Sequence, residues 1–365
     1  MSNPRPAILN DQPMKLGVFA SNCSGGLSMT GAPRTLEITW DHQREIAQKA
    51  DRLGFEAIVP IARWKGFGGD TNFNGRSFET FTWAAGLASV TENISIVATT
   101  HVATIDPVVA AKMAATVDHI SGGRFGLNLV MGWFKPEMDM MQCRLLGHDE
   151  RYAYGAEWFD FVEQLWTRTE PFDVDSTFFH AVGCESEPKP LQAHRPAIIN
   201  AGNSAAGVAF SAKYADINFL ASTDLDQMAV YTADVKRKAP EEHQRDLKTM
   251  TAAIVIARDT EAEAKQVYDQ ILEKGDWPGA ENLMGILGIE SQSFSEQIQK
   301  FKERFITGWG TMPLVGTPEQ VVEGFQGMAE SGMEGVLMGF LDYSEEIDYF
   351  GEKVLPLMRE AGLRK

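Results

Sequence analysis

Cysteine is scarce in this chain of 365 residues, and its three cysteines, Cys23, Cys143 and Cys184, form no CxxC pair. An odd number of isolated thiols argues against a disulfide framework and indicates a reducing compartment, so we expect a cytoplasmic protein. The seven histidines form no HxH, HxxxH or HExxH pair. These are the common zinc-hydrolase signatures, and we therefore expect no bound metal.

Long apolar runs and basic clusters are also missing. No stretch reaches 18 uninterrupted apolar residues, and the opening MSNPRPAILNDQP lacks the features of a secretion signal. Lysine and arginine number 33 against 50 acidic residues, which gives a net charge of -17 without any basic run. We therefore predict a protein that neither crosses a membrane nor binds nucleic acid.

Several catalytic motifs are absent as well. The Gly-rich segment KGFGGDTNFNG (65–75) follows neither the GxGxxG order of dinucleotide folds nor the GxxxxGK[ST] order of P-loops, and no GxSxG elbow occurs. These absences weaken nicotinamide, nucleoside triphosphate and serine-hydrolase interpretations. The composition, with 44% hydrophobic and 23% charged residues, is that of an ordinary globular protein with a sizeable core.

Short β-branched runs alternate with helical patterns along the chain, which is typical of βα units around a parallel sheet. Eight strands are predicted, at 15–20, 56–60, 94–100, 125–130, 197–202, 216–221, 251–257 and 335–341. Amphipathic stretches predict helices at 39–53, 77–90, 107–120, 149–166, 224–237, 259–273, 317–331 and 345–361. Eight such units predict an α/β protein with a (β/α)8 TIM barrel, which we expect to form one domain over 1–365.

Three segments exceed the usual connection of about 2 to 6 residues. They are 21–38 after the first strand, 167–196 before the fifth, and 274–316 after the seventh. Loops that follow barrel strands gather at the carboxyl ends of the strands. The first and third segments could therefore cover a site at that face.

Two predicted helix starts contain groups that suit an anion. The segment AGNSAAG (201–207) joins a strand to a helix, and Ser204 lies beside backbone N–H groups that a helix start leaves unpaired. Arg151 and Tyr152 begin another helix and supply a guanidinium and a phenol. Taken alone, each start is better explained without a ligand, the first by a serine cap and the second by a solvated first turn. Both starts lie at the same barrel face, which favours a phosphorylated cofactor.

Polar residues interrupt two strands that are otherwise apolar. Asn128 lies within FGLNLV, and Thr99 lies near the end of the preceding strand. A buried amide needs partners, so the choice is between a core hydrogen bond and a site where both side chains stabilise a reactive anion. His101 directly follows the third predicted strand and could face a site, but we interpret it as a structural histidine with satisfied nitrogens.

The stretch MAATVDHISGGRFGLNLVMGWFKPEMDMM (113–141) resembles the bacterial luciferase-like, FMN-dependent two-component monooxygenases. RWKGFGGDTNF (63–73), HDERY (148–152), AGNS (201–204) and YADINF (214–219) extend the resemblance, which covers residues 14–362. The KGFGG loop is more similar to the pyrimidine monooxygenases of this family. The HDERY helix and the end of the chain, 339–360, look at least as similar to its dimethyl sulfone monooxygenases.

This resemblance implies a luciferase-like barrel that binds FMN, receives it reduced from a separate NAD(P)H:flavin reductase, uses dioxygen as co-substrate, and forms a homo-oligomer. It also implies roles for individual residues. Flavin contacts are implied for Ala62, Arg63, Asn128 and Glu137, phosphate contacts for Arg151, Tyr152 and Ser204, a dioxygen pocket for Thr99, Asn128 and Trp133, and substrate contacts for Ile61, Arg63 and Phe219.

The chain departs from the pyrimidine enzymes beside the substrate. They have methionine and lysine where this sequence has Ile61 and Arg63. A guanidinium fork thus replaces a point charge, which argues against uracil itself as the substrate.

We therefore expect a monooxygenase that uses reduced FMN and dioxygen to cleave a carbon–heteroatom bond. The expected substrate is a small N-heterocycle or cyclic amide, and an organosulfur compound such as dimethyl sulfone is the alternative. The absence of motifs for a nucleophilic side chain is consistent with a reaction in which the cofactor supplies the reactive group. A deazaflavin (F420)-dependent dehydrogenase and a non-catalytic flavin-binding protein on the same barrel remain open.

Overall fold

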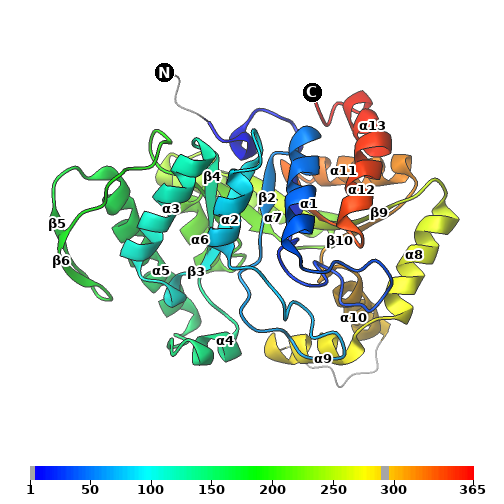
Figure 1. Ribbon diagram of the computed structural model, residues 1–365, viewed down its shortest axis with the longest axis horizontal. Helices are drawn as coiled ribbons and strands as arrows, with labels where there is room; N and C mark the ends of the chain where they lie inside the picture. Colours follow the sequence, from blue (N-terminus) through cyan, green and yellow to red (C-terminus); the bar gives the residue numbers. More distant parts are fainter. Residues whose placement is uncertain (1–4, 289–295) are drawn as a thin grey trace.

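Eight parallel strands form a closed barrel in the computed structural model, which describes residues 5–288 and 296–365 (Figure 1). The strands, in barrel order, are β1 (Lys15–Phe19), β2 (Ala57–Val59), β3 (Ser95–His101), β4 (Phe125–Val130), β7 (Ala197–Asn200), β8 (Ile217–Leu220), β9 (Lys248–Ala257) and β11 (Gly335–Gly339). Pairing of β11 with β1 closes the ring. The predicted TIM barrel and all eight predicted strands are confirmed.

The strands are apolar on both faces because each lies between the barrel interior and a helix layer. In β3, Val97 belongs to the interior cluster, whereas Ile96 and Ala98 pack outward against helices. A short 3-10 turn, η1 (Ala7–Leu9), packs against the interior cluster from the amino end. There Ile8 is fully buried and its N–H donates to Ser95 Oγ at 3.0 Å.

Helices surround the barrel in the order that the sequence predicts (Figure 1). They are α1 (Trp40–Arg52), α2 (Thr80–Ala88), α3 (Pro107–Ser121), α5 (His148–Thr167), α6 (Ala205–Tyr214), α7 (Leu225–His243), α8 (Glu261–Glu273), α11 (Pro318–Glu330), α12 (Tyr343–Tyr349) and α13 (Leu355–Glu360). The predicted helix at 345–361 is confirmed as helical backbone, in which a π-helical turn, η3 (Phe350–Val354), joins α12 to α13. No helix in the described ranges is both long and apolar enough to cross a bilayer.

The long segments differ in content. Residues 167–196 contain a hairpin, β5 (Phe172–Asp175) and β6 (His180–Cys184), which projects from the side of the molecule in Figure 1. Residues 274–316 contain α9 (Trp277–Ile286), α10 (Glu296–Gly308) and β10 (Met312–Gly316). β10 is not among the predicted strands, and its Pro313 lacks a backbone donor. It is accommodated because β10 pairs only with β9 in the described sheet and so forms an edge.

Candidate functional site

A cavity of about 580 Å³ opens at the carboxyl ends of the barrel strands. Most side chains singled out in the sequence line it: Ile61, Ala62, Arg63, Thr99, Asn128, Trp133, Arg151, Tyr152 and Phe219. Glu137 and Ser204 do not line it. Two guanidinium groups border the cavity, and none of its described lining residues is Asp or Glu. The cavity therefore favours ligands that carry negative charge or hydrogen-bond acceptors.

Register places Thr99 and Asn128 side by side, because they are paired residues of the neighbouring strands β3 and β4. Asn128 Nδ2 donates to Thr99 Oγ1 at 3.2 Å, and Thr99 Oγ1 donates to the carbonyl of Pro60 at 2.6 Å. The Thr99 proton is thus engaged. Asn128 Oδ1 is buried and has no hydrogen-bond partner in the described part of the chain. A buried amide oxygen in this state is a ready acceptor for a ligand N–H.

Arg63 is enclosed by aromatic rings at the cavity wall. Its guanidinium carbon lies 4.9 Å from the ring centroid of Phe67, 5.3 Å from that of Trp133 and 5.2 Å from that of Phe134. Burial lowers the pKa of Arg63, against the attraction of Glu137. Arg63 Nη1 lies 3.4 Å from Glu137 Oε1. Arg63 Nε and Nη1 have no hydrogen-bond partner within the described ranges, so the fork still has donors to offer.

Glu137 holds the loop after β2 from behind the cavity wall. It belongs to α4 (Lys135–Met140), is fully buried, and its Oε1 accepts from the N–H groups of Trp64 at 2.7 Å and Lys65 at 3.0 Å. Its place behind Arg63 means that the contact with flavin expected for Glu137 remains a prediction. In the structure, the Glu137 carboxylate orients Arg63 and the backbone of the two residues that follow it.

His101 completes this buried cluster. It lines the cavity, and its Nδ1 lies 3.8 Å from Glu137 Oε2 without a hydrogen-bond partner among the described residues. The sequence-based interpretation of a histidine with satisfied nitrogens is therefore wrong for Nδ1. The sequence could have signalled this through position alone, since His101 ends β3 two residues after Thr99.

Acid should destabilise the protein through His101. Burial, followed by the charge of Arg63, lowers the pKa of His101 from 6.5 to about 3. Below pH 6.5 the unfolded chain binds a proton that the folded chain refuses, so stability falls as pH falls. Between pH 7.5 and pH 5 the loss from this group is about 2 kcal/mol.

Urea unfolding of the native protein and of His101→Gln at pH 7.5 and pH 5 measures this effect. We expect the native protein to lose about 2 kcal/mol more than the variant, because glutamine does not titrate. Equal losses in the two proteins would contradict a neutral, buried His101.

The other end of the cavity suits a phosphate. Arg151 Nη1 donates to the carbonyl of Gly132, whereas Nε has no partner among the residues that the structure describes. Burial raises the pKa of Tyr152, against a hydrogen bond with Ser204. Ser204 caps α6 by accepting from Gly207 N–H at 3.1 Å, so the proposed cap is confirmed, whereas phosphate binding by Ser204 remains a prediction.

The approach of α6 to α5 requires glycine in the loop between β7 and α6. A Cβ on Gly202 would lie 2.5 Å from Tyr152 Oη and 2.6 Å from Gly207 Cα. Tyr231 Oη lies 3.1 Å from both the carbonyl of Gly202 and Asn203 Oδ1, so its single proton is shared among acceptors of the same loop and its neighbourhood. The loop and the start of α6 are thus preorganised before any ligand arrives.

Residues after α9 and on α10 roof the cavity. The roof consists of Leu287, Phe301, Phe305 and Trp309. The segment 274–316 thus covers the site as expected, whereas no described residue of 21–38 lines it. Sequence reasoning missed all four roof residues, because a large apolar side chain in or beside an amphipathic helix carries no motif.

Asp276 ties this roof to the loop after β2. Its carboxylate accepts from Asp70 N–H at 3.0 Å, from Thr71 N–H at 2.8 Å and from the Thr71 hydroxyl at 2.6 Å, and it also caps α9 through Gly279 N–H. Asn282 Nδ2 adds a hydrogen bond to the carbonyl of Phe67 at 3.0 Å. The roof and the loop that carries Arg63 are therefore one connected assembly.

Comparisons with known proteins agree with this geometry. The family model described as luciferase-like monooxygenase matches residues 14–335. The FMNH2-dependent dimethylsulfone monooxygenase of Pseudomonas putida is 32% identical over 362 residues, 96% of this chain and 96% of its own length. Pyrimidine monooxygenase RutA of Enterobacter cloacae is 35% identical over 362 residues, 95% of this chain and 96% of its own.

A solved structure shares the fold. Riboflavin lyase RcaE, crystallised with modified FMN and its substrate riboflavin, superposes with a TM-score of 0.87. The alignment covers 97% of this chain and 93% of that one at 21% identity. A similarity at this level of identity supports the architecture alone. The family assignment rests on the family model and on the sequence relatives.

Proposed function

We propose, because this chain belongs to the luciferase-like monooxygenase family, that it inserts one atom of dioxygen into a small polar substrate with reduced FMN. The proposal includes a separate NAD(P)H:flavin reductase that delivers the reduced flavin, a homo-oligomeric assembly and a cytoplasmic location. The relatives that match over nearly the whole chain are named for FMNH2 or for oxygenation of small molecules.

The unsatisfied polar groups at the two ends of the cavity carry this proposal. At one end Asn128 offers a buried acceptor and Arg63 buried donors, and at the other Arg151, whose Nε has no partner among the described residues, lines the cavity together with Gly202 and Asn203, which precede α6. An isoalloxazine ring has both N–H and carbonyl groups, and a ribityl phosphate suits a guanidinium and a helix start. A cavity of about 580 Å³ lies in the range that one cofactor-sized ligand fills. The residues present fit FMN.

Reduced FMN, when bound, supplies the electrons that let one oxygen atom of dioxygen enter the substrate while the other leaves as water. The chain's own residues bind and orient. We assign phosphate binding to Arg151, Tyr152 and the start of α6 at Ser204, and ring orientation to Asn128 and the backbone at Ala62. The aromatic roof excludes water from the reacting groups.

Arg63 is the residue that we expect to select the substrate. Its fork offers donors beside the cavity without a competing carboxylate on the wall, which favours a guest with carbonyl or sulfonyl oxygens. Asn128 Oδ1 adds an acceptor for a ring N–H, and this favours a small N-heterocycle or cyclic amide. Dimethyl sulfone or another organosulfur compound is the second candidate, because the Pseudomonas putida relative is named for that reaction.

Incubation of the purified chain with FMN, a flavin reductase, NADH and 18O-labelled dioxygen tests the proposal. Mass spectrometry follows a panel of pyrimidines and cyclic amides beside a panel of sulfones and sulfonates. We expect a product that carries one labelled oxygen and requires the reductase. Tight FMN binding without labelled product from either panel would instead support a non-catalytic flavin protein, and turnover without oxygen would support hydride transfer.

A further inference from the structure

A second, smaller cavity adjoins the main one. This side chamber, of about 210 Å³, lies between the start of α2, the end of β3 and α3. Phe78, Phe81, Ile105 and Met113 supply its apolar surface. Ala62, Arg63, Thr99 and His101 line both cavities, so a single layer of side chains separates them.

Several polar groups around the side chamber are committed to the protein itself, whereas Arg63 Nε and Nη1 and His101 Nδ1 have no hydrogen-bond partner among the described residues. The hydroxyl of Thr80 donates to the carbonyl of Thr99 at 2.7 Å, and that of Thr104 donates to the carbonyl of His101 at 2.8 Å. The carboxylate of Glu79 caps α2 by accepting from the N–H groups of Phe81 and Thr82, each at 2.8 Å. A guest without hydrogen-bonding groups therefore displaces no strong interaction there.

The main cavity has one roofed space, and its size suits a single cofactor-sized ligand with a small guest. Once the cofactor and the substrate fill the main cavity, a third reactant needs a separate route to the site. Dioxygen is small and apolar, and the side chamber ends at Thr99, the residue bonded to Asn128.

We propose that the side chamber is the route by which dioxygen reaches the Thr99 side of the site. The inference rests on the proposed monooxygenase function and adds a path that is separate from the entry of flavin and substrate. His101 and Thr99 form the wall that the path shares with the main cavity, and Met113 on α3 lines the side chamber.

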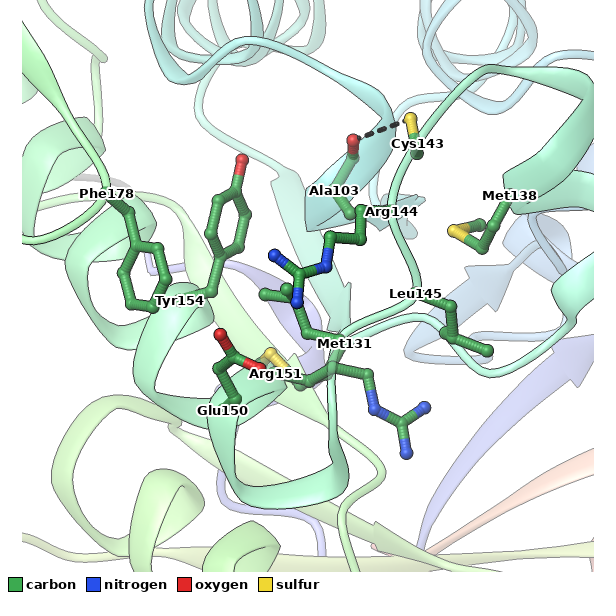
Figure 2. Close-up of a pocket in the computed structure, with 11 residues that line it drawn as sticks. Ala103, Met131, Met138, Cys143, Arg144, Leu145, Glu150, Arg151, Tyr154 and Phe178 are labelled. Atoms are coloured by element: carbon green, nitrogen blue, oxygen red, sulfur yellow. Dashed lines mark hydrogen bonds between the residues drawn. The ribbon is translucent and has the colours of Figure 1, made fainter.

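A third cavity provides the contrast (Figure 2). It has a similar volume, about 230 Å³, but meets the main cavity at Met131 and Arg151, at the end that suits the phosphate. Arg144 and Glu150 also line it, and Cys143 Sγ donates to the carbonyl of Ala103 at 3.0 Å. Thr99 does not line this space and Leu145 does not line the side chamber, so added bulk at Leu145 provides the control.

Met113→Trp fills the side chamber, and Leu145→Trp places the same bulk in the control space of Figure 2. Each protein, loaded anaerobically with reduced FMN, is mixed with buffers of rising oxygen content in a stopped-flow instrument. We expect Met113→Trp to lower the second-order rate constant for flavin oxidation about tenfold, because dioxygen then reaches the flavin about tenfold more slowly. The dissociation constant for FMN and the rate constant of Leu145→Trp should stay within about twofold of the native values.

Xenon gives a readout that does not depend on turnover, because it occupies dry apolar cavities. Crystals of the native protein pressurised with xenon should show an atom between Phe78, Ile105 and Met113, and crystals of Met113→Trp should lack it. If Met113→Trp does not fold, Ile105→Phe replaces it in both experiments.

Two outcomes would overturn the route: unchanged oxygen kinetics in a folded variant that fills the chamber, or xenon absent from the chamber while it enters other cavities. Failure of the monooxygenase proposal looks different. In that case the native protein forms no oxygenated product from either substrate panel, whatever the xenon positions.

Discussion

Replacing Arg63 by methionine should lower kcat/KM by about 100-fold or more, because a buried charged donor beside the reacting groups is lost. The same change should cost about 3 to 5 kcal/mol of the free energy of unfolding, since it leaves the fully buried Glu137 carboxylate without its cation. Methionine matches the aliphatic stem of arginine and its thioether suits aromatic neighbours, so part of the packing against Phe67, Trp133 and Phe134 is retained.

A double-variant cycle separates the two effects. Glu137→Gln combined with Arg63→Met removes both charges, and we expect the free energy of unfolding to recover in large part while kcat/KM stays low. Arg63→Lys keeps the charge but loses the fork, so an intermediate activity is expected. Urea unfolding and initial rates measure both quantities. Full activity in Arg63→Met would contradict any role for the guanidinium in substrate binding.

Replacing Asn128 by leucine should lower oxygen-dependent product formation by about 100- to 1,000-fold, the usual effect of losing one preorganised polar group from a reaction site. Leucine fills a similar volume, and Asn128 has one unpartnered buried atom, so the protein should still fold. Thr99→Val removes the partner of Asn128 and should lower activity as well, whereas Thr99→Ser keeps the hydroxyl and should recover most of it.

The measurement is product formed per NADH consumed, with FMN affinity followed separately by fluorescence. A monooxygenase should lose product formation while it retains FMN in the low-activity variants. A dehydrogenase that transfers hydride to a deazaflavin needs no oxygen pocket, so Asn128→Leu would leave its turnover largely intact. Unchanged turnover would therefore favour that alternative.

The barrel was predictable because its strands are buried on both faces and appear as short apolar runs. Ser95–His101, for example, is buried throughout, and the sequence places its end within one residue. Elements whose formation depends on tertiary contacts were not predictable. Pro313 argues against a strand until an edge of β9 is available, and the π-turn after Tyr349 leaves no mark in the helical periodicity.

In the candidate site, too, the residues on strands were predictable from the sequence, whereas those placed by tertiary contacts were not. Neighbouring strands place Thr99 beside Asn128 through their register, and a sequence that predicts the strands predicts the pair. The pairing of Arg63, Glu137 and His101 depends on how the loops after β2 and β4 fold against each other. Chemistry-bearing residues in loops are therefore recognised by family resemblance or by the structure, because local periodicity does not place them.

Asp276 couples two stretches that are distant in sequence, the loop 66–75 and the segment 274–316, so a change in one affects the other. A chimaera that receives the roof of a relative without a carboxylate at this position would leave the amides of Asp70 and Thr71 without their acceptor. Transplanting residues 66–75 together with 274–316 would keep that contact. To change the substrate range of this scaffold, the two segments should thus be exchanged together. In libraries that vary only one of them, we expect many proteins in which the roof is poorly held over the cavity.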